Sequence, residues 1–305
     1  MAEQFDTWGR WGEDDERGAL NLLTPEVVVA AAGAVRTGRI VNLGLPIRAS
    51  NAGARPAPHL RGRPLPQHYM NVDGGDYAAG ARRLHDEMCL SDDTVIVTAH
   101  GTSTHVDALA HAWRGDVLYN GHEARKILSF GAARCGIDKM GGVAARGVLF
   151  DVAGHLGVPF LDESVAIDAD LLRECLDASG QELRPGDVAV VRTGWPTVFE
   201  TDEARYQGGQ PGLAYDGAHW LAEQDVCMIA CDNSGVGQIA MDGTFAAPLD
   251  EDVHLLCLWE RGIPLAEMLW LEELATYGQK EFLFVLAPLT IVGGTASPVN
   301  PLAIL

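Results

Sequence analysis

The stretch DADLLRECLDASGQELRPGDVAVVRT, residues 168–193, contains one helix and one strand in succession and decides the fold class. Asp168 is a helix-capping residue, residues 169–178 have a helical pattern, and Gly180 is a residue type that ends helices. Residues 187–193 form a short β-branched run that is apolar on both faces. A helix followed by a strand buried on both faces predicts an α/β protein with layers around one sheet.

The same alternation of strands and helices continues along the whole chain. The pattern predicts further strands at 94–99, 147–152, 226–231 and 281–286, and further helices at 25–35, 215–224 and 252–261. Residues 53–66 are rich in Pro, Gly and Arg and are predicted to be a surface loop. No change of composition marks a boundary, so we predict a single domain over residues 1–305 with a mixed sheet and surrounding helices.

Composition and charge exclude several classes of function. The chain has 22 Lys and Arg against 42 Asp and Glu, and its net charge of -20 would repel nucleic acid and anionic membranes. We expect a small-molecule substrate and neither a nucleic-acid nor a membrane partner. Residues 1–18 are acidic where a signal peptide would be basic and then apolar, which predicts a cytoplasmic protein. The six cysteines include no CxxC pair and are predicted to be reduced.

The run HGTSTHVDALAH, residues 100–111, concentrates the side chains that can carry chemistry. His105 and Asp107 are two positions apart, so in an extended segment both side chains point to the same side. An imidazole with a carboxylate suits zinc, manganese or iron(II). His100 is a candidate third ligand, and His111 is a candidate for proton transfer beside the metal. The run therefore predicts a metal site, and the alternative is a chance cluster of polar residues.

Residues 100–111 resemble the signature HxGTHxDAPxH of the kynurenine formamidase/cyclase family, which includes isatin hydrolases and trans-dienelactone hydrolases. The resemblance covers nearly the whole chain. WGRWGEDDERGALNLLTPE (8–26), RTGW (192–195) and PLTIVGGTASPVNPLAIL (288–305) are similar to the family's N-terminal segment, strand-end motif and C-terminal run. The resemblance implies the family's fold, which is a swivelling β/β/α arrangement with a mixed sheet.

The resemblance also implies roles for individual residues of the run. His105 and Asp107 match metal ligands, and His111 matches the catalytic acid/base. Four residues separate His100 from His105 where the signature has three, and Leu109 replaces a proline. The longer spacing leaves open whether His100 binds the metal or is replaced there by water.

A second segment, residues 254–267, is similar to the family's helix-then-strand segment. The resemblance implies that His254 and Glu267 either complete a second metal site or orient the first. Asp107 would bridge the two ions if both bind. The expected cofactor is a divalent cation, Zn²⁺ or Mn²⁺.

A metal-activated water would hydrolyse an amide or lactone, and the resemblance implies that the substrate is a small cyclic or aromatic compound. Trp113, Trp195 and His122 are predicted to contact the substrate. Two alternatives stay open: a cyclase, dehydratase or isomerase on the same scaffold, and a non-catalytic metal-binding protein. The resemblance further implies a homodimer or homotetramer in which residues 1–24 form an N-terminal arm that reaches a neighbouring subunit.

Overall fold

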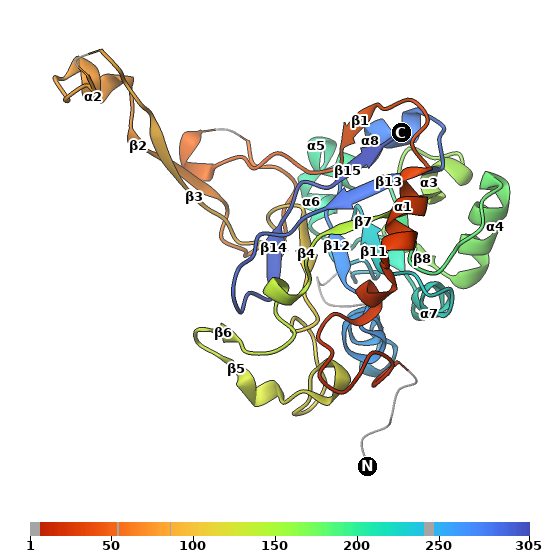
Figure 1. Ribbon diagram of the computed structural model, residues 1–305. Coiled ribbons are helices and arrows are strands. Elements are labelled where there is room, and N and C mark those ends of the chain that lie inside the picture. The colour runs from red at the N-terminus through yellow and green to blue at the C-terminus, as the bar shows by residue number, and fades with distance from the viewer. Residues whose placement is uncertain (1–6, 54, 86, 241–246) are drawn as a thin grey trace.

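The computed structural model describes residues 7–53, 55–85, 87–240 and 247–305 (Figure 1). It has an α/β architecture with one large mixed sheet and helices around it, which confirms the predicted fold class. The four central strands run parallel, and the strands outside them pair antiparallel. In spatial order the nine strands of this sheet are β1 (Ile40–Asn42), β15 (Leu302–Ile304), β13 (Glu281–Leu286), β7 (Val143–Asp151), β9 (Val188–Arg192), β11 (Met228–Cys231), β12 (Leu265–Glu267), β4 (His105–Asp107) and β14 (Ala296–Pro298).

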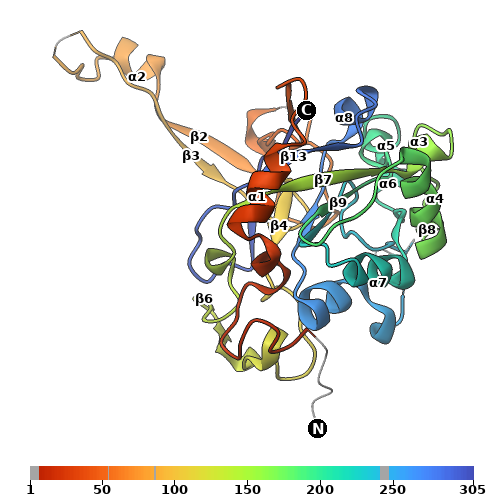
Figure 2. The same cartoon turned by 45° about the vertical axis from the view of Figure 1, so that its right-hand side comes forward.

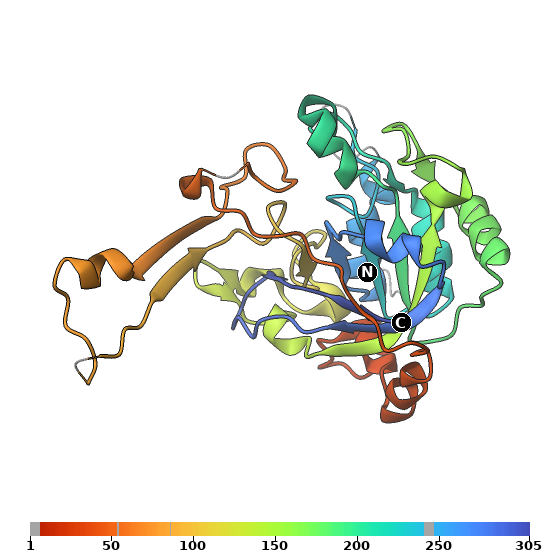
Figure 3. The ribbon, with the colours of Figure 1, turned by 90° about the horizontal axis from the view of Figure 1, so that it is seen from above.

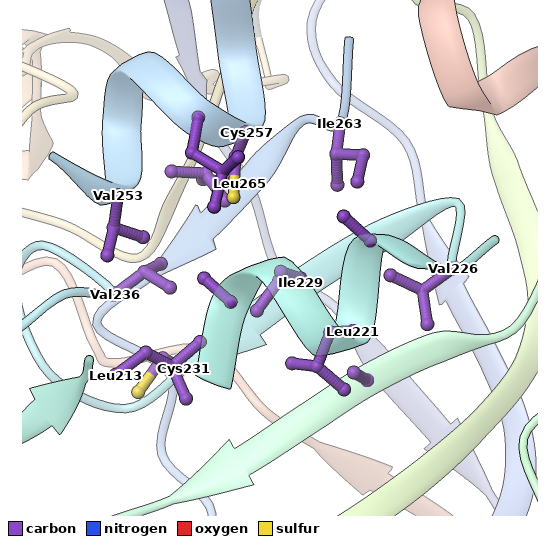
Figure 4. Packing of buried hydrophobic residues seen from close by; sticks show 14 of the residues in the cluster. Leu213, Leu221, Val226, Ile229, Cys231, Val236, Val253, Cys257, Ile263 and Leu265 are labelled. Atoms are coloured by element: carbon purple, nitrogen blue, oxygen red, sulfur yellow. The ribbon is translucent and has the colours of Figure 1, made fainter. Parts of the chain in front are cut away.

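The central strands are buried on both faces, as the sequence predicted. All residues of β9 and β11 are buried, and alternate residues enter different hydrophobic clusters. Ile229 and Cys231 belong to the layer that contains Leu221 and Cys257, whereas Met228 belongs to the opposite layer. Figure 4 shows the first of these layers, where Ile229 and Cys231 of β11 lie among side chains such as Leu221, Cys257 and Leu265. This alternation is the two-residue period of a strand, which places successive side chains on opposite faces.

The two helices with the strongest sequence signals form where they are predicted. In α1 (Pro25–Ala32) the Thr24 hydroxyl accepts the first-turn amide of Val27. In α4 (Ala169–Ser179) the Asp168 carboxylate caps the helix and Gly180 ends it with a φ of 68°. Figures 2 and 3 show α1 beside β7 and α4 next to α7 (Tyr215–Glu223). Of the helices that the structure describes, none combines the length and the apolar character that spanning a bilayer requires.

The remaining described elements are short. They are η1 (Gly18–Leu22), η2 (Ser50–Ala52), β2 (Gln67–Val72), α2 (Gly74–Ala78), β3 (Asp92–Ile96), η3 (Tyr119–Gly121), η4 (Ala124–Lys126), β5 (Ile127–Leu128), β6 (Gly131–Ala132), η5 (Ile137–Lys139), α3 (Val152–His155), β8 (Ala166–Ile167), α5 (Pro196–Thr201), α6 (Glu203–Tyr206), β10 (Gly212–Leu213), η6 (Leu249–Glu251), η7 (Leu255–Arg261) and α8 (Glu272–Thr276).

One predicted strand lies in a different place from the one expected. The run 94–99 was predicted as a strand that leads directly into the metal-binding residues. Instead β3 pairs with β2 in a hairpin that projects from the body, and all its residues are exposed (Figure 1). His100 therefore lies on an irregular connection four residues beyond the strand. A β-branched run sets strand propensity, but it does not determine which sheet the strand joins.

The helix predicted at 252–261 is shorter than expected, and most of it is a π-helix, which is wider than an α-helix. The Asp252 carboxylate accepts the amide of Leu255, and η7 then forms a π-helix that ends at Gly262. Gly262 has a φ of 66°, and a Cβ there would lie 2.5 Å from the Tyr119 ring. Only glycine therefore fits this helix end. Short π-helical turns are rare and are found frequently at functional sites.

The N-terminal segment packs against its own chain in the region described, residues 7–24. The Trp8 indole donates to the Trp259 carbonyl at 2.9 Å and lies edge-on to Tyr119. Arg10 forms an ion pair with Asp225. Apolar contacts and hydrogen bonds therefore attach these residues to the body of their own chain, and their contact with a neighbouring subunit stays a prediction.

Arg192, at the end of β9, joins two carboxylates inside the protein. Its guanidinium donates to Asp151 at 2.8 Å and to both oxygens of Glu272 at 2.8 and 2.9 Å. We expect Arg192→Ala to lower the free energy of unfolding by about 3–5 kcal/mol, because two partly buried carboxylates lose their counter-charge. Urea unfolding measures this change. Removal of the exposed Arg173, which pairs with Asp170, should change stability by less than about 0.5 kcal/mol; similar losses for both variants would contradict the argument.

Candidate metal centre

Six polar side chains from distant parts of the sequence converge at one end of the sheet. β4 supplies two of them, and it pairs antiparallel with β12 so that Glu267 lies directly across from His105. The cluster consists of His100, His105, Asp107, His111, His254 and Glu267, which are all the residues predicted as metal ligands or as the acid/base.

Asp107 lies at the centre of this cluster and is fully buried. Its Oδ1 is 3.2 Å from His100 Nε2 and 3.6 Å from His105 Nε2. Its Oδ2 is 3.7 Å from His111 Nε2 and 3.8 Å from His254 Nε2. One carboxylate therefore faces all four imidazoles.

Glu267 closes the other side of the cluster. Its Oε2 lies 3.2 Å from His105 Nε2, and its Oε1 lies 3.2 Å from His254 Nε2. The two buried carboxylates are thus separated by imidazole rings, which reduces the electrostatic cost of burying both of them.

The donor set and its geometry fit a divalent cation. The residues form two groups, and within each group the potential ligand atoms lie within 4.8 Å of one another. One group is His100, Asp107 and His111, and the other is His105, Asp107 and Glu267. Several buried atoms in these groups make no hydrogen bond to any described residue, although buried polar atoms normally have a partner. These atoms are His100 Nε2, His105 Nε2, both carboxylate oxygens of Asp107, and Glu267 Oε1.

His100 belongs to the cluster despite its longer spacing from His105. Its ring stacks on that of His111, with centroids 4.0 Å apart. Gly101 makes the necessary turn with a φ of 76°, and its carbonyl accepts the amide of Leu60 at 2.8 Å. The additional residue is therefore absorbed in the turn, and His100 stays within reach of Asp107.

The carboxylates and histidines of the cluster shift one another's pKa values. Burial alone would lower the pKa of His105, but the carboxylates of Glu267 and Asp107 outweigh burial and raise this pKa to about 9. Burial would raise the pKa of Asp107, but the neighbouring histidines hold it well below its usual range. Protons on imidazole therefore balance the carboxylates, as a bound cation would.

His111 behaves differently because it lies at the edge of the cluster. Burial and the nearby His100 and His254 rings lower its pKa to about 4, although Asp107 opposes this shift. His111 is therefore neutral near pH 7, which is the state that can accept a proton.

Proton release should accompany metal binding, because a cation must displace the proton from His105 Nε2. Since this pKa is raised to about 9, apparent metal affinity should increase about tenfold per pH unit between pH 7 and pH 9 and level off above that. Calorimetric titration in buffers of different ionisation enthalpy measures the released protons. An affinity that is independent of pH over this range would contradict the prediction.

Hydrogen bonds around β4 fix the orientation of the ligand side chains. His105 Nδ1 donates to the Ser103 carbonyl at 2.8 Å, which leaves Nε2 directed at the carboxylates. The Thr104 hydroxyl donates to the Met268 carbonyl at 2.6 Å and accepts the amide of Leu45 at 2.8 Å. Because Met268 follows Glu267, Thr104 connects both ligand-bearing strands.

Thr104→Val should test this connection with little change in side-chain volume. We expect a loss of stability of about 1–3 kcal/mol, because the Leu45 amide and the Met268 carbonyl lose their partner. We also expect metal affinity to fall about 10- to 100-fold, as is usual when support for a ligand is lost. Thr104→Ser keeps the hydroxyl and is the control. Unchanged metal binding in the valine variant would show that Thr104 does not position the site.

A pocket of about 370 Å³ lies beside the cluster. Trp113, which is 40% exposed, forms part of its wall, so the structure places this predicted residue next to His111. Arg114 and Asp250 form an ion pair at 2.7 Å. Because these residues follow Trp113 and Leu249, the ion pair connects two segments that line the pocket. The lining residues are His111, Ala112, Trp113, Leu249, Asp252, His254 and Leu255.

The structure does not bring the other two predicted substrate-binding residues to this pocket. Trp195 is fully buried in a separate cluster, where it stacks on Tyr206. Its indole is inaccessible there, so the prediction is corrected to a core role. His122 Nε2 contacts the Asp15 carbonyl at 2.9 Å, and this places it at the N-terminal segment instead.

The sequence model of the Cyclase family matches residues 24–238. This chain belongs to the Cyclase family. No curated protein sequence matches it.

Solved structures extend this cyclase-family relationship over nearly the whole chain. A crystal structure described as a novel cyclase is 33% identical, covers 99% of this chain and 100% of its own, and has a TM-score of 0.88. Isatin hydrolase A from Ralstonia solanacearum is 19% identical, with coverage of 92% and 98% and a TM-score of 0.61. A predicted metal-dependent hydrolase from Bacillus stearothermophilus is 19% identical, with coverage of 87% and 97% and a TM-score of 0.51. The last two similarities show a shared fold.

Sequence reasoning missed some residues that shape the site. Leu249 and Leu255 line the same pocket as Trp113, and Thr104 connects the ligand strands. The leucines have no sequence signal, since isolated aliphatic residues are ordinary core residues. Thr104 lies inside the run 100–111, but its role depends on a carbonyl more than a hundred positions away.

Proposed function

We propose that this cyclase-family chain is a metal-dependent hydrolase of a small cyclic or aromatic amide or lactone. The observation that carries the proposal is the cluster of four histidines around two buried carboxylates, which lies beside an open pocket. Buried carboxylates and imidazole nitrogens that make no hydrogen bond are costly unless a proton or a cation lies between them.

The chain offers two places for a cation, and they share Asp107. His105 and Glu267 complete one group, and His100 and His111 complete the other. A divalent cation bound there would polarise a substrate carbonyl and increase the acidity of a water molecule. Imidazole and carboxylate ligands fit Zn²⁺ or Mn²⁺.

The chain's own residues would then move a proton and hold the substrate. His111 Nε2 lies at the boundary between the cluster and the pocket, and its lowered pKa keeps it neutral near pH 7. We assign it the role of base, which accepts a proton from the attacking water and returns it to the leaving amine or alkoxide. His254 lies near the same oxygen of Asp107 as His111 does, and it lines the same pocket.

The pocket favours a flat, weakly polar substrate. Trp113, Leu249 and Leu255 provide apolar walls, and His111, Asp252 and His254 provide the polar groups. Its volume of about 370 Å³ suits a bicyclic or smaller molecule. The fold shared with isatin hydrolases supports this choice of substrate class.

We further propose an intracellular location and assembly into a homodimer or homotetramer. The six free cysteines support the first proposal, because disulfides are usual in oxidising compartments.

A second candidate is a cyclisation, dehydration or isomerisation at the same site, and the relative described as a novel cyclase favours it. The two reactions differ in the fate of solvent oxygen. Hydrolysis transfers one oxygen atom from ¹⁸O-labelled water to the product, whereas cyclisation and isomerisation transfer none.

The deciding experiment combines metal analysis with a substrate panel. Protein purified without added ions is analysed for metal, and N-formylkynurenine, isatin and a dienelactone are then tested with each divalent ion. We expect one or two equivalents of Zn²⁺ or Mn²⁺ and hydrolysis of at least one compound. A protein that binds no divalent cation at micromolar concentration would overturn the proposal.

A further inference from the structure

Residues 27–72 carry positive charge in a strongly acidic chain. They contain six arginines and no lysine, aspartate or glutamate, so their formal charge is 6 - 0 = +6, whereas the whole chain has a net charge of -20. Arg61 and Arg63 are both exposed, and neither forms an ion pair with any residue that the structure describes. Two guanidinium groups without a counter-charge therefore lie close together in this segment.

Both of these arginines line a pocket of about 550 Å³ between their loop and α6. The volume is within the range of pockets that hold small organic ligands. None of the residues that line this pocket also lines the pocket beside the metal centre. The two pockets are therefore separate candidate binding sites.

A tight turn brings the two arginines to the same pocket. The Arg63 amide donates to the Leu60 carbonyl at 3.4 Å, and Gly62 has a φ of 81°. This left-handed conformation at the third position of a turn favours glycine, because a side chain there would be strained. The turn separates the two arginines by a single glycine, and both side chains line the pocket.

The side-chain amide of Gln207 attaches this loop to α6 at two points. Its Nε2 donates to the His59 carbonyl at 2.6 Å, and its Oε1 accepts the amide of Arg61 at 2.8 Å. On the other side of the loop, the Leu60 amide donates to the Gly101 carbonyl at 2.8 Å. The backbone that carries the arginines is thus fixed before a ligand arrives, which lowers the entropic cost of binding.

Most carboxylates around α6 are engaged by other arginines. Glu200 pairs with Arg55, and Glu163 pairs with Arg205. Glu203 is the only acidic residue among the described residues that line the pocket. One carboxylate cannot balance two guanidinium groups, so the lining of the pocket keeps a net positive charge.

We propose that this pocket binds a small organic anion and that Arg61 and Arg63 hold its carboxylate or phosphate group. Guanidinium groups present N–H donors in a planar arrangement that matches the oxygens of both kinds of anion. Leu65 and Ala204 offer apolar surface to the rest of the ligand. This inference goes beyond the proposed hydrolase activity and does not depend on it.

The first test is calorimetric titration of the full-length protein with benzoate and with phenyl phosphate, and neutral benzamide is the control. We expect at least one of the anions to bind with a dissociation constant at or below about 1 mM at low ionic strength, and benzamide to bind at least about tenfold more weakly. The comparison of benzoate with phenyl phosphate shows which acidic group the pocket prefers. Absence of binding by both anions at about 10 mM would overturn the inference.

Variants of the lining residues locate the bound anion. Arg61→Ser and Arg63→Ser should each weaken binding about tenfold or more, because each removes charge-assisted hydrogen bonds. Glu203→Gln should strengthen binding about two- to fivefold, since it removes the repelling carboxylate. Arg48→Ser is the matched control, because Arg48 is exposed in the same segment, has no ion pair with a described residue and does not line the pocket. An equal loss in the Arg48 variant would indicate unspecific attraction and overturn the site.

A divalent cation also attracts anions, so the titrations are repeated with Asp107→Asn protein and after treatment with a chelator. We expect the anion affinity to change little, because the pocket shares no lining residue with the metal centre. Circular dichroism checks that every variant stays folded. Anion binding that disappears together with the metal would place the ligand at the metal centre and overturn the inference. Binding that persists would support it even if the protein hydrolyses none of the compounds of the substrate panel.

Discussion

Asp107→Asn is expected to abolish tight metal binding and, with it, activity. Asp107 is the only residue in both groups of potential ligands, and its two oxygens face all four histidines. Asparagine keeps the volume but removes the charge and replaces one oxygen with an NH₂ group, which cannot bind a cation. Since loss of a supporting residue alone costs about 10- to 100-fold in affinity, we expect metal affinity and kcat/KM to fall at least about 100-fold.

Metal content by elemental analysis, calorimetric titration and turnover of the active panel compound measure these effects. Asp170→Asn is the matched control, because Asp170 is exposed on α4 and pairs only with Arg173 among the described residues. The control should keep full metal content and activity. An Asp107→Asn protein that retains its metal would show that Asp107 is not a ligand and would contradict the central assignment.

His111→Gln is expected to lower kcat about 10²- to 10⁴-fold while metal content stays near that of the wild type. Glutamine keeps a polar side chain at the pocket but cannot accept a proton near pH 7. The acidic limb of the pH–rate profile, which reports a base, should also disappear. His122→Gln is a suitable control, since His122 contacts the Asp15 carbonyl and does not line the pocket beside His111.

The same variant distinguishes two roles that the structure allows for His111. The residue lies beside the pocket, as a base would, but it also lies within ligand distance of His100 and Asp107. Loss of one equivalent of metal from His111→Gln would assign it as a ligand and refute the role of base. A variant with full metal content and full activity would remove His111 from the mechanism altogether.

Local signals in the sequence were sufficient for most of the fold. The caps at Thr24 and Asp168 and the glycine at 180 correctly predicted two helices, because the atoms that end a helix come from neighbouring residues. The β-branched runs that became β9 and β11 were recognisable because burial on both faces requires apolar residues at every position.

The run 94–99 shows the limit of this reasoning. It has the composition of a buried strand, but β3 lies in an exposed hairpin. Likewise, no local signal indicated that Trp8 packs on Tyr119 and Trp259. In both cases the residue type favours burial of the side chain, but the residues that pack against it depend on the whole fold.

By itself the sequence determined the fold class, the family and the identities of the six clustered side chains, because these depend on residue types at short or family-characteristic spacings. Only the tertiary structure decided that His100 reaches Asp107 through the turn at Gly101, that Trp113 lines the pocket while Trp195 is core, and that residues 67–96 project from the body. The physical reason is that such contacts join residues far apart in the chain, and their geometry depends on how β4 and β12 pair and on what packs around them.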